Sequence, residues 1–506
     1  MQIGREEIFT DYSVINELNI EEVMRLAMPI HEKNASKIDF LLNYEAGCQP
    51  LVRKEPKKYR PEIDCHCVDN VANEITEFKL GFIWGNPITL IQRGENDSGE
   101  KNESLAISLL NECYEAEKNK AKTQKLARFV EITGIGYTYI DINAEWKEGE
   151  SYFKVETLDP RCTFLVRSNY YIDQRPVMAV TYRCDKKGNK YYTCFTKDSR
   201  YELNSSFEHL PYSGEMNPIG EIPVIEWIRS YDRMGCFERQ ISEMDNLNLL
   251  ISDFTNDVES NTQAIWHGND VEFPKVIVKN EDGTQTEEVV KPKGNDWMLT
   301  YTSQDGKTPT VKPLAIDYDY QGMLSNIISR RNLILQKCNI PNRVNDNSGS
   351  TGVAMDTASG YTTAESSASK QQNIMEASKM DEVKIALIAI KKNPRISNDN
   401  PMLKLNAIDI QPSIKRRKDF ELTTKINFFA TAVSHGVHGL HALKAMNAFE
   451  DVNQTWEDSK ELIEMYQKSI FMKENQSVGG DGERKPNSDR ISQDMSDQQE
   501  NSPFMN

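Results

Sequence analysis

Residues 237–260 have the sequence FERQISEMDNLNLLISDFTNDVES, and this stretch decides the fold. Its apolar residues recur at steps of four, three, three, four, three and four: Phe237, Ile241, Met244, Leu247, Ile251, Phe254 and Val258. Such steps put one narrow apolar seam on a helix that packs against neighbouring helices. A helix that continued to Trp266 would contain thirty residues and extend about 45 Å. The stretch therefore predicts one long helix with a single packed face.

The same stretch is strongly acidic away from the seam. It contains one base, Arg239, and six acids: Glu238, Glu243, Asp245, Asp253, Asp257 and Glu259. We therefore expect the face opposite the seam to be negative. The alternative interpretation of this pattern is the solvated surface of a soluble coiled coil.

A small β insertion follows this helix, and a second helix then returns. The segments EFPKVIVK (272–279) and TEEVVKP (286–292) flank Asn280-Glu281-Asp282-Gly283, which predicts a hairpin. Further strands are expected at 297–302 and 310–316, and the returning helix at 318–337. Together these elements predict a projecting arm that ends in a small β subdomain.

The chain before residue 235 has the pattern of an α+β domain. Helical spacing predicts a helix at 20–44, a second one that ends near Leu80, and helical structure across 105–133. From residue 134 the pattern changes to the alternation that is typical of strands, and several short strand candidates follow up to Arg229.

The chain after the arm starts with a polar stretch, 339–361, that predicts a mobile loop. A long helix is expected at 362–391 and one strand, MLKLNAIDI, at 402–410. The region 419–471 is expected to be mostly helical, with a break near 434–439. Few apolar residues remain after residue 474, which predicts a disordered tail.

Composition limits the possible functions. The length of 506 residues predicts roughly three structural units of about 150 residues. The net charge of −17 is opposite to that of proteins that hold nucleic acid by its phosphates, so tight non-specific DNA binding is disfavoured. The polar start and the shortness of the uncharged runs predict no signal peptide and no membrane anchor, and hence synthesis in the cytoplasm. The nine cysteines include no CxxC pair, so reduced thiols are expected.

Sequence motifs do not favour an enzyme. Asp305-Gly306-Lys307-Thr308 resembles the end of a phosphate-binding loop, but position 301 is Tyr instead of the first glycine, and Pro309 follows where a helix should begin. We interpret these residues as a turn with a solvated Lys307. The motifs GxSxG and HExxH do not occur. We therefore expect no catalytic residue, cofactor or nucleotide site.

Two clusters could suggest a metal. His435, His438 and His441 follow one another at helical steps, but Gly436 and Gly439 oppose a rigid helix there, so a junction between helices is the preferred interpretation. Cys65-His66-Cys67 has no second ligand pair at suitable spacing and is interpreted as structural. No metal site is expected.

The densest basic run, 415–418, permits two interpretations. It consists of Lys415, Arg416, Arg417 and Lys418. Four adjacent cations raise the local potential enough for a nucleic-acid contact. The alternative is a solvated helix start or a salt-bridged contact between subunits.

Three stretches resemble the portal proteins of tailed bacteriophages, particularly those of the siphophage branch that infects Gram-positive hosts. They are YEAGCQPLVRK (44–54), VDNVANEITEFKLGFIWGNPITL (68–90), and the stretch 216–260 that contains NPIGEIPVIE and the acidic helix. The residues of that helix that match the family pattern are Asp245, Leu247, Asn248, Ser252, Asp253, Asn256 and Asp257. The resemblance extends from about residue 40 to 470. One departure is STGVAM at 350–355, where relatives often have Ser-Gly-x-Ala-Leu.

The resemblance implies an α+β fold with portal-type architecture. It assigns an α/β wing to 1–235, to which a strand and long helix in 338–412 return. It assigns a long-helix stem to 236–267 and 317–337, and a small β clip to the insertion 268–316. It assigns a helical crown to 413–473 and a disordered tail to 474–506.

The resemblance also implies a function. About twelve copies would form a ring at one capsid vertex, through which double-stranded DNA is packaged and ejected. The terminase large subunit would hydrolyse the nucleotide and dock near the clip, and a head-tail adaptor would occupy that end later. Major capsid and scaffold proteins would be further partners. The protein would be found in the host cytoplasm during assembly and then in the virion, with no membrane partner.

Candidate functional residues follow from these assignments. The candidates for lining the channel are Glu243, Asp253 and Asp257. The tunnel-loop candidates are Asn345, Asp346, Asn347, Ser348, Gly349, Ser350, Thr351 and Gly352. The clip candidates for contacting partners are Lys279, Glu281, Asp282, Gly283 and Lys307. An acidic wall would repel phosphates and let DNA slide.

Two alternatives to a portal ring remain open: an enzyme of the DNA-packaging machinery, and a head-tail adaptor without a channel.

Overall fold

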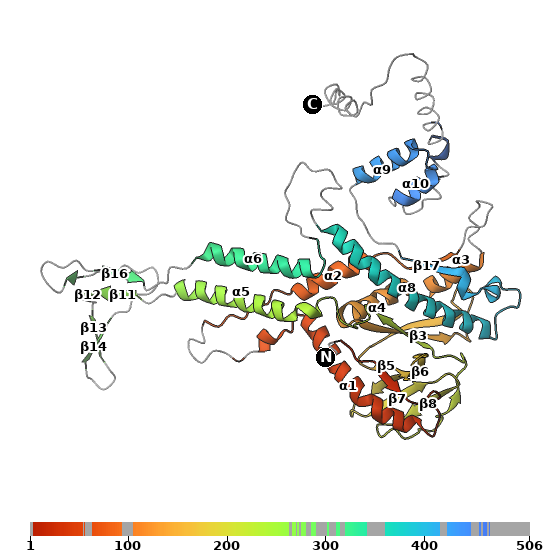
Figure 1. The fold of residues 1–506 in the computed structure, drawn as a ribbon. Coiled ribbons are helices and arrows are strands. Elements are labelled where there is room, and N and C mark those ends of the chain that lie inside the picture. The colour runs from red at the N-terminus through yellow and green to blue at the C-terminus, as the bar shows by residue number, and fades with distance from the viewer. Residues whose placement is uncertain are drawn as a thin grey trace, which may run out of the picture. The chain divides into compact units, whose positions relative to one another are not determined.

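The protein has a mixed α+β structure, given by a computed structural model (Figure 1). It describes residues 4–53, 55, 63–93, 105–262, 266–269, 271–272, 275–279, 285–289, 301–302, 310–313, 319–341, 360–414, 422–446, 455–456, 459–462 and 465. The chain divides into unit 1, Met1–Arg417, and unit 2, Lys418–Asn506.

The larger sheet of unit 1 has six strands in the order β1-β5-β6-β7-β8-β9. These strands are β1 (Ile8–Thr10), β5 (Thr163–Ser168), β6 (Pro176–Cys184), β7 (Lys190–Phe195), β8 (Ser199–Leu203) and β9 (Glu215–Met216). Strand β1 pairs with β5 in parallel, and the other pairs are antiparallel. Helix α1 (Ile20–Glu45) buries Met24 and Met28 against Val166 and Val180 of this sheet. The helix predicted at 20–44 is confirmed.

The smaller sheet has three strands, in the order β10 (Val224–Ile228), β3 (Ile135–Ile142) and β4 (Phe153–Leu158). Helices α4 (Asn119–Thr133) and α8 (Tyr361–Lys392) contact it. Leu126 and Val130 of α4 share a buried cluster with Trp227 of the sheet. A two-stranded sheet joins β2 (Thr89–Gln92) to β17 (Ile410–Ser413). Helix α8 confirms the long helix predicted at 362–391.

Outside the arm, the structure differs from the predicted elements at 105–133 and at 402–410. The helical spacing at 105–133 belongs to two helices, α3 (Leu105–Ala116) and α4, because Lys118 adopts a left-handed φ of 56° between them. The strand predicted at 402–410 is wrong. Pro401–Lys404 and Ala407–Asp409 are 3₁₀ turns, and the strand begins at Ile410. The Asn400 side chain accepts a hydrogen bond from the Met402 amide and so begins the first turn.

The insertion and its two flanking helices follow the predicted order. Strand β11 (Trp266–Asn269) pairs with β16 (Thr310–Pro313), β12 (Val271–Glu272) with β15 (Tyr301–Thr302), and β13 (Lys275–Lys279) with β14 (Gln285–Val289). The β13–β14 pair confirms the predicted hairpin. Helix α5 (Ile241–Thr262) precedes the insertion and α6 (Tyr320–Lys337) follows it. Helix α5 does not continue to Trp266, because it ends at Thr262 and Trp266 begins β11.

Unit 2 contains α9 (Leu422–Ser434) and α10 (Gly439–Met446) in its described part. Leu443 and Met446 pack with Trp456. The break between the helices confirms the predicted one, and Gly436 has a φ of 88° there. The disordered tail predicted at 474–506 lies outside the described residues.

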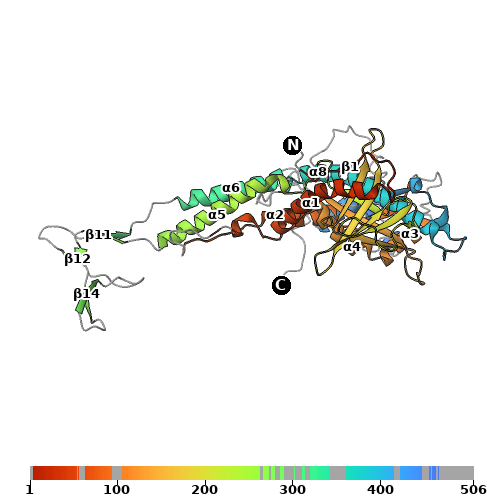
Figure 2. The same cartoon turned by 90° about the horizontal axis from the view of Figure 1, so that it is seen from below.

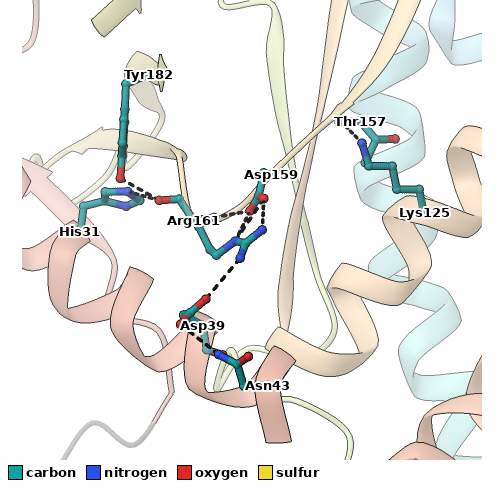
Figure 3. Close-up of polar contacts among 8 residues, drawn as sticks. All are labelled: His31, Asp39, Asn43, Lys125, Thr157, Asp159, Arg161 and Tyr182. Atoms are coloured by element: carbon teal, nitrogen blue, oxygen red, sulfur yellow. Dashed lines mark hydrogen bonds and ion pairs between the residues drawn. The ribbon is translucent and has the colours of Figure 1, made fainter. Parts of the chain in front are cut away.

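His31 and Glu226 are buried groups whose pKa values are set by the packing of the six-stranded sheet and its neighbours. The imidazole of His31 stacks on Phe164, and its Nε2 lies 3.0 Å from the Arg161 carbonyl oxygen (Figure 3). Burial lowers the pKa of His31 to about 4, although the Arg161 carbonyl opposes this shift. Burial alone would raise the pKa of Glu226, but the guanidinium groups of Arg233 and Arg167 outweigh burial and lower it to about 2.

These two groups predict that acid destabilises the fold in two steps. The ordinary pKa of histidine is 6.5 and that of glutamate is 4.5. Between pH 6.5 and 4, His31 binds a proton in the unfolded chain but not in the folded chain, so stability falls as the pH falls. Glu226 has the same effect between pH 4.5 and 2. Each step should lower the free energy of unfolding by about 3 kcal/mol. Urea titrations across this range measure the loss.

The variant His31→Gln separates the two steps. It should remove most of the loss between pH 6.5 and 4 and leave the loss at lower pH unchanged, because Glu226 is intact. If the variant and the original chain lost equal stability between pH 6.5 and 4, His31 would not be the group that titrates.

Candidate functional site

Helices α5 and α6 lie side by side and run in opposite directions (Figures 1 and 2). Glu243, near the N-terminal end of α5, lies 3.6 Å from Lys337 at the C-terminal end of α6. Phe254, in the C-terminal half of α5, and Tyr320, at the N-terminal end of α6, have ring centroids 6.0 Å apart. Met244 is buried in the cluster that holds the apolar residues of α6. The seam predicted from the sequence is therefore the contact between these two helices.

The two helices differ in charge. Helix α5 contains five acids and no base, whereas α6 contains three bases and no acid. Glu243 approaches two of these bases, Arg330 at 4.0 Å and Lys337 at 3.6 Å. Because of these contacts, Glu243 lies between the helices. The free face of α5 carries Asp253, which is exposed, with Asp257 half-buried beside it. In the described part of the chain, no cation lies within ion-pair distance of either aspartate.

A third element lies against the pair. Residues 63–70, here called the strap, are extended along α5 and are held by the polar residues Asn248, Ser252 and Asn256. The amide of Cys65 donates to Asn256 Oδ1 at 2.7 Å, and the amide of Cys67 donates to Ser252 Oγ at 2.9 Å. Asn256 and Ser252 also donate back to the carbonyl oxygens of the same two residues.

The spacing of these contacts follows from helix and strand geometry. The amide of Asp69 donates to Asn248 Oδ1 at 2.9 Å, so alternate strap residues meet every fourth residue of α5. Four helical residues rise about 6.0 Å, and two extended residues span about 6.6 Å. The two repeats match closely enough for three successive contacts. The side chains of α5 thus replace the partner strand that the strap lacks.

The strap also binds α6. Arg331 of α6 lies 2.8 Å from the Asp69 carboxylate and also pairs with Glu74, which belongs to α2 (Val71–Ile83). Residues 63–74 therefore join both helices of the pair to α2. This arrangement limits how far the two helices can move relative to the rest of unit 1.

Removing the strap contacts should free the strap. The double variant Ser252→Ala, Asn256→Leu removes the acceptors for two strap amides, each of which contributes about 1 kcal/mol. Hydrogen exchange at the amides of Cys65 and Cys67 should become at least tenfold faster.

The matched control is Ser242→Ala with Asn246→Leu, which changes the same residue types on the exposed face of α5. It should leave exchange in the strap unchanged. Equal exchange rates in the two double variants would show that the side chains of α5 do not hold the strap.

A buried charged cluster lies at the base of the paired helices. Glu131 of α4 is fully buried and accepts hydrogen bonds from Trp84 Nε1 at 2.9 Å, from Arg229 Nε at 3.1 Å, and from Gln371 of α8. Its main-chain oxygen accepts from the Cys236 amide at 2.7 Å, just before α5. One residue therefore joins α4, α8 and the start of α5.

Lys79 of α2 holds the end of α6 near this cluster. It is 1% exposed, and its ammonium donates to the Asn339 carbonyl oxygen at 3.4 Å. Burial lowers the pKa of Lys79, and the negative charge of Glu131 opposes the shift. Asn339 has a left-handed φ of 56°, so the chain turns sharply where α6 ends. Both flanks of the segment 342–359 are thus fixed, by Lys79 before it and by the contact of Gln371 with Glu131 after it.

Several residues singled out in the sequence lie outside the described residues. These are the tunnel-loop candidates 345–352, the basic run 415–418, and the clip candidates Glu281, Asp282, Gly283 and Lys307. Lys279, the remaining clip candidate, ends strand β13.

The two clusters considered for metal binding have other contacts. Cys65 Sγ lies 3.3 Å from Cys67 Sγ, and His66 pairs with Asp64. The His438 ring packs on Trp456, with 5.0 Å between ring centroids. Within the described ranges, no group of three histidine, cysteine or acidic side chains could hold a metal ion. None of the helices described there is both long enough and apolar enough to cross a bilayer.

Sequence reasoning missed the residues that hold the base of the helix pair. The family pattern includes Asn248, Ser252 and Asn256 but does not indicate what these residues do. Their spacing of four along a line beside the seam was the available signal. Nothing in the local sequence distinguished Glu131 or Lys79 from the many solvated charges of the chain.

Comparison with known proteins assigns the class. Residues 29–469 match the model of the family described as "Phage portal protein, SPP1 Gp6-like". No curated protein matches the sequence. Because the match covers most of the chain, the protein belongs to this phage portal family. It is a portal protein of the capsid vertex, which forms the channel for DNA packaging and connects head to tail.

Proposed function

We propose that about twelve copies form a ring in which the α5–α6 pairs make the stem of the channel. The wing would comprise 1–235 and the strand and helix of 338–412, the clip 268–316, and the crown 413–473. The observation that carries this proposal is the α5–α6 pair, which is anchored at its base and leads to a small β insertion. Its free face carries Asp253 without an ion-pair partner among the described residues.

The acidic face suits a channel wall. A cationic wall would attract phosphates and release their counterions, which would hold the DNA in place. Asp253 and Asp257 repel phosphates instead, within the Debye length of about 8 Å at physiological salt. Double-stranded DNA would therefore pass without being bound.

The proposed partners follow the same assignment. The terminase large subunit would dock at the clip during packaging and hydrolyse the nucleotide, and a head-tail adaptor would bind there afterwards. Lys279 and the hairpin that follows it are the proposed contacts. The run Lys415–Lys418, where the two units of the chain meet in sequence, would contact DNA or a neighbouring subunit. Major capsid and scaffold proteins would surround the ring, and the phage would belong to the siphophage branch with Gram-positive hosts.

The portal family is structural, and we propose that this chain has no catalytic activity of its own. Purified protein should show neither ATPase nor nuclease activity above that of a matched blank. Hydrolysis that copurifies with the ring and survives removal of any terminase would instead favour an enzyme of the packaging machinery.

The segment between α6 and α8 is the proposed tunnel loop. Deleting 345–359 should leave ring assembly intact, because the contacts of Lys79 and Gln371 that fix its flanks remain. DNA packaging or retention should fall, since the loop would no longer reach the DNA. Native mass measurement reports assembly, and protection of packaged DNA from nuclease reports retention. Unchanged packaging by the shortened chain would remove the loop from the mechanism.

A further inference from the structure

Two thiols of the strap lie against each other. The Sγ atoms of Cys65 and Cys67 are 3.3 Å apart. Side chains two residues apart in an extended segment point to the same side, which explains why these thiols meet across His66. Both cysteines are half-buried, whereas Cys113, Cys194, Cys236 and Cys338 are buried. A small solute can therefore reach the strap thiols.

The geometry of the strap permits a disulfide between these two residues. A disulfide places its sulfur atoms about 2.05 Å apart and its Cα atoms usually about 4.4 to 6.8 Å apart. Two extended residues span about 6.6 Å, which lies near the upper limit of that range. The sulfur atoms would have to approach by only about 1.3 Å. Rotation of the two side chains can supply this movement, so the strap backbone can stay on α5.

The same two residues hold the strap on α5. The amide of Cys65 donates to Asn256, and the amide of Cys67 donates to Ser252. A covalent link between Cys65 and Cys67 would limit the conformations that the strap can adopt after it leaves the helix. The bound strap is already ordered and would lose little freedom. The link should therefore favour the strap that is bound to α5.

Such a disulfide would be easily reversed. Its ring would contain one intervening residue, with Cα atoms near the upper limit of disulfide geometry, and strained or exposed disulfides are the readily reduced ones. The cytosol keeps thiols reduced. The two thiols should therefore stay free there and join when the protein meets an oxidising solution.

We infer that Cys65 and Cys67 form a reversible disulfide, and that this disulfide fixes the strap to α5 when the protein leaves a reducing compartment. Because the strap joins α5 and α6 to α2, the oxidised chain would connect the helix pair more firmly to the rest of unit 1. The inference concerns contacts within one chain and does not depend on the proposed ring.

The oxidant is a low-molecular-weight disulfide. The thiolate of one cysteine attacks a sulfur atom of the oxidant, which releases one small thiol and leaves a mixed disulfide. The thiolate of the second cysteine then attacks the protein sulfur of this mixed disulfide and releases the second small thiol. The two cysteines together lose two protons and two electrons, and the oxidant is reduced to two thiols.

Thiol mapping tests whether the bond forms. The full-length chain carries Cys48→Ser and Cys184→Ser, which removes the two exposed thiols. It is treated with glutathione disulfide, and the remaining free thiols are alkylated. Peptide mass analysis should show Cys65 joined to Cys67, with neither glutathione nor alkylation on either residue. Excess glutathione should restore both thiols.

The matched controls are Cys65→Ser and Cys67→Ser in the same background. Each should retain one glutathione as a mixed disulfide, because the second thiol that would displace it is absent. If the chain with both strap cysteines instead showed both residues alkylated, or both carrying glutathione, the inference would be overturned. Neither result would affect the proposed ring.

Hydrogen exchange tests whether the bond fixes the strap. Exchange at the amides of Cys65 and Cys67 should be slower in the oxidised chain than in the reduced chain, by about threefold or more. The Cys67→Ser control should show no such slowing at Cys65 after the same treatment. Equal or faster exchange in a chain that thiol mapping shows to be oxidised would mean that the disulfide does not fix the strap, and the inference would be wrong.

Discussion

Replacing both Asp253 and Asp257 with lysine is expected to slow DNA packaging several-fold. Each substitution changes a repelling charge into an attracting one, and the change is repeated in every copy of the ring. Phosphates would then release counterions at the wall and be held there. The rate of DNA translocation in a packaging reaction with terminase and ATP measures the effect.

The cause of this slowing can be tested with salt. Attraction between phosphates and exposed lysines weakens as the Debye length shortens, so the variant should recover speed as salt is raised. The control Glu145→Lys with Glu148→Lys makes the same change in net charge on an exposed loop between β3 and β4. Equal rates for the original chain and the stem variant would show that these aspartates do not face the DNA or that their charge is irrelevant.

Replacing Glu131 with alanine is expected to destabilise unit 1 by about 3 to 5 kcal/mol, because removing one partner of a buried ion pair leaves the other charge uncompensated. Arg229 would lose its carboxylate, and the buried Lys79 would lose the nearby negative charge that favours its ammonium form. Trp84 and Gln371 would lose a shared acceptor. Denaturant unfolding of the purified protein measures the loss.

Two further variants define the cause. Glu131→Gln retains an acceptor for Trp84 but removes the charge, so its free energy of unfolding should lie between those of the original chain and the alanine variant. Glu115→Ala removes an exposed glutamate from α3 and should change stability little, because surface ion pairs contribute little. If Glu131→Ala were as stable as Glu115→Ala, the buried cluster would not hold the base of the helix pair.

Regular periodicity explains which parts of the fold could be predicted. The apolar seam of α5 identified both the helix and the face that packs on α6, because helical spacing depends only on local sequence. The hairpin of β13 and β14 was predicted from its turn residues for the same reason. In contrast, Asn400 and Pro401 start a turn at the beginning of the apolar run 402–410, whose composition alone predicts a strand.

Contacts between distant segments explain what could not be predicted. Asn256 and Cys65 are far apart in the sequence, and only the folded chain shows that one satisfies the backbone of the other. Glu131 resembles any surface glutamate until Trp84, Arg229 and Gln371 surround it. Of the proposed channel residues, Glu243 is drawn toward Lys337 by a contact that the sequence of α5 alone did not predict.

The central claim is that copies of this chain form a closed ring with a channel, to which the α5–α6 pairs contribute the stem. Electron microscopy of the purified protein, combined with native mass measurement, tests it most directly. We expect a ring of about twelve copies with an open central channel, into which the faces that carry Asp253 point. A protein that stays monomeric at high concentration, or a ring without a continuous channel, would contradict the claim.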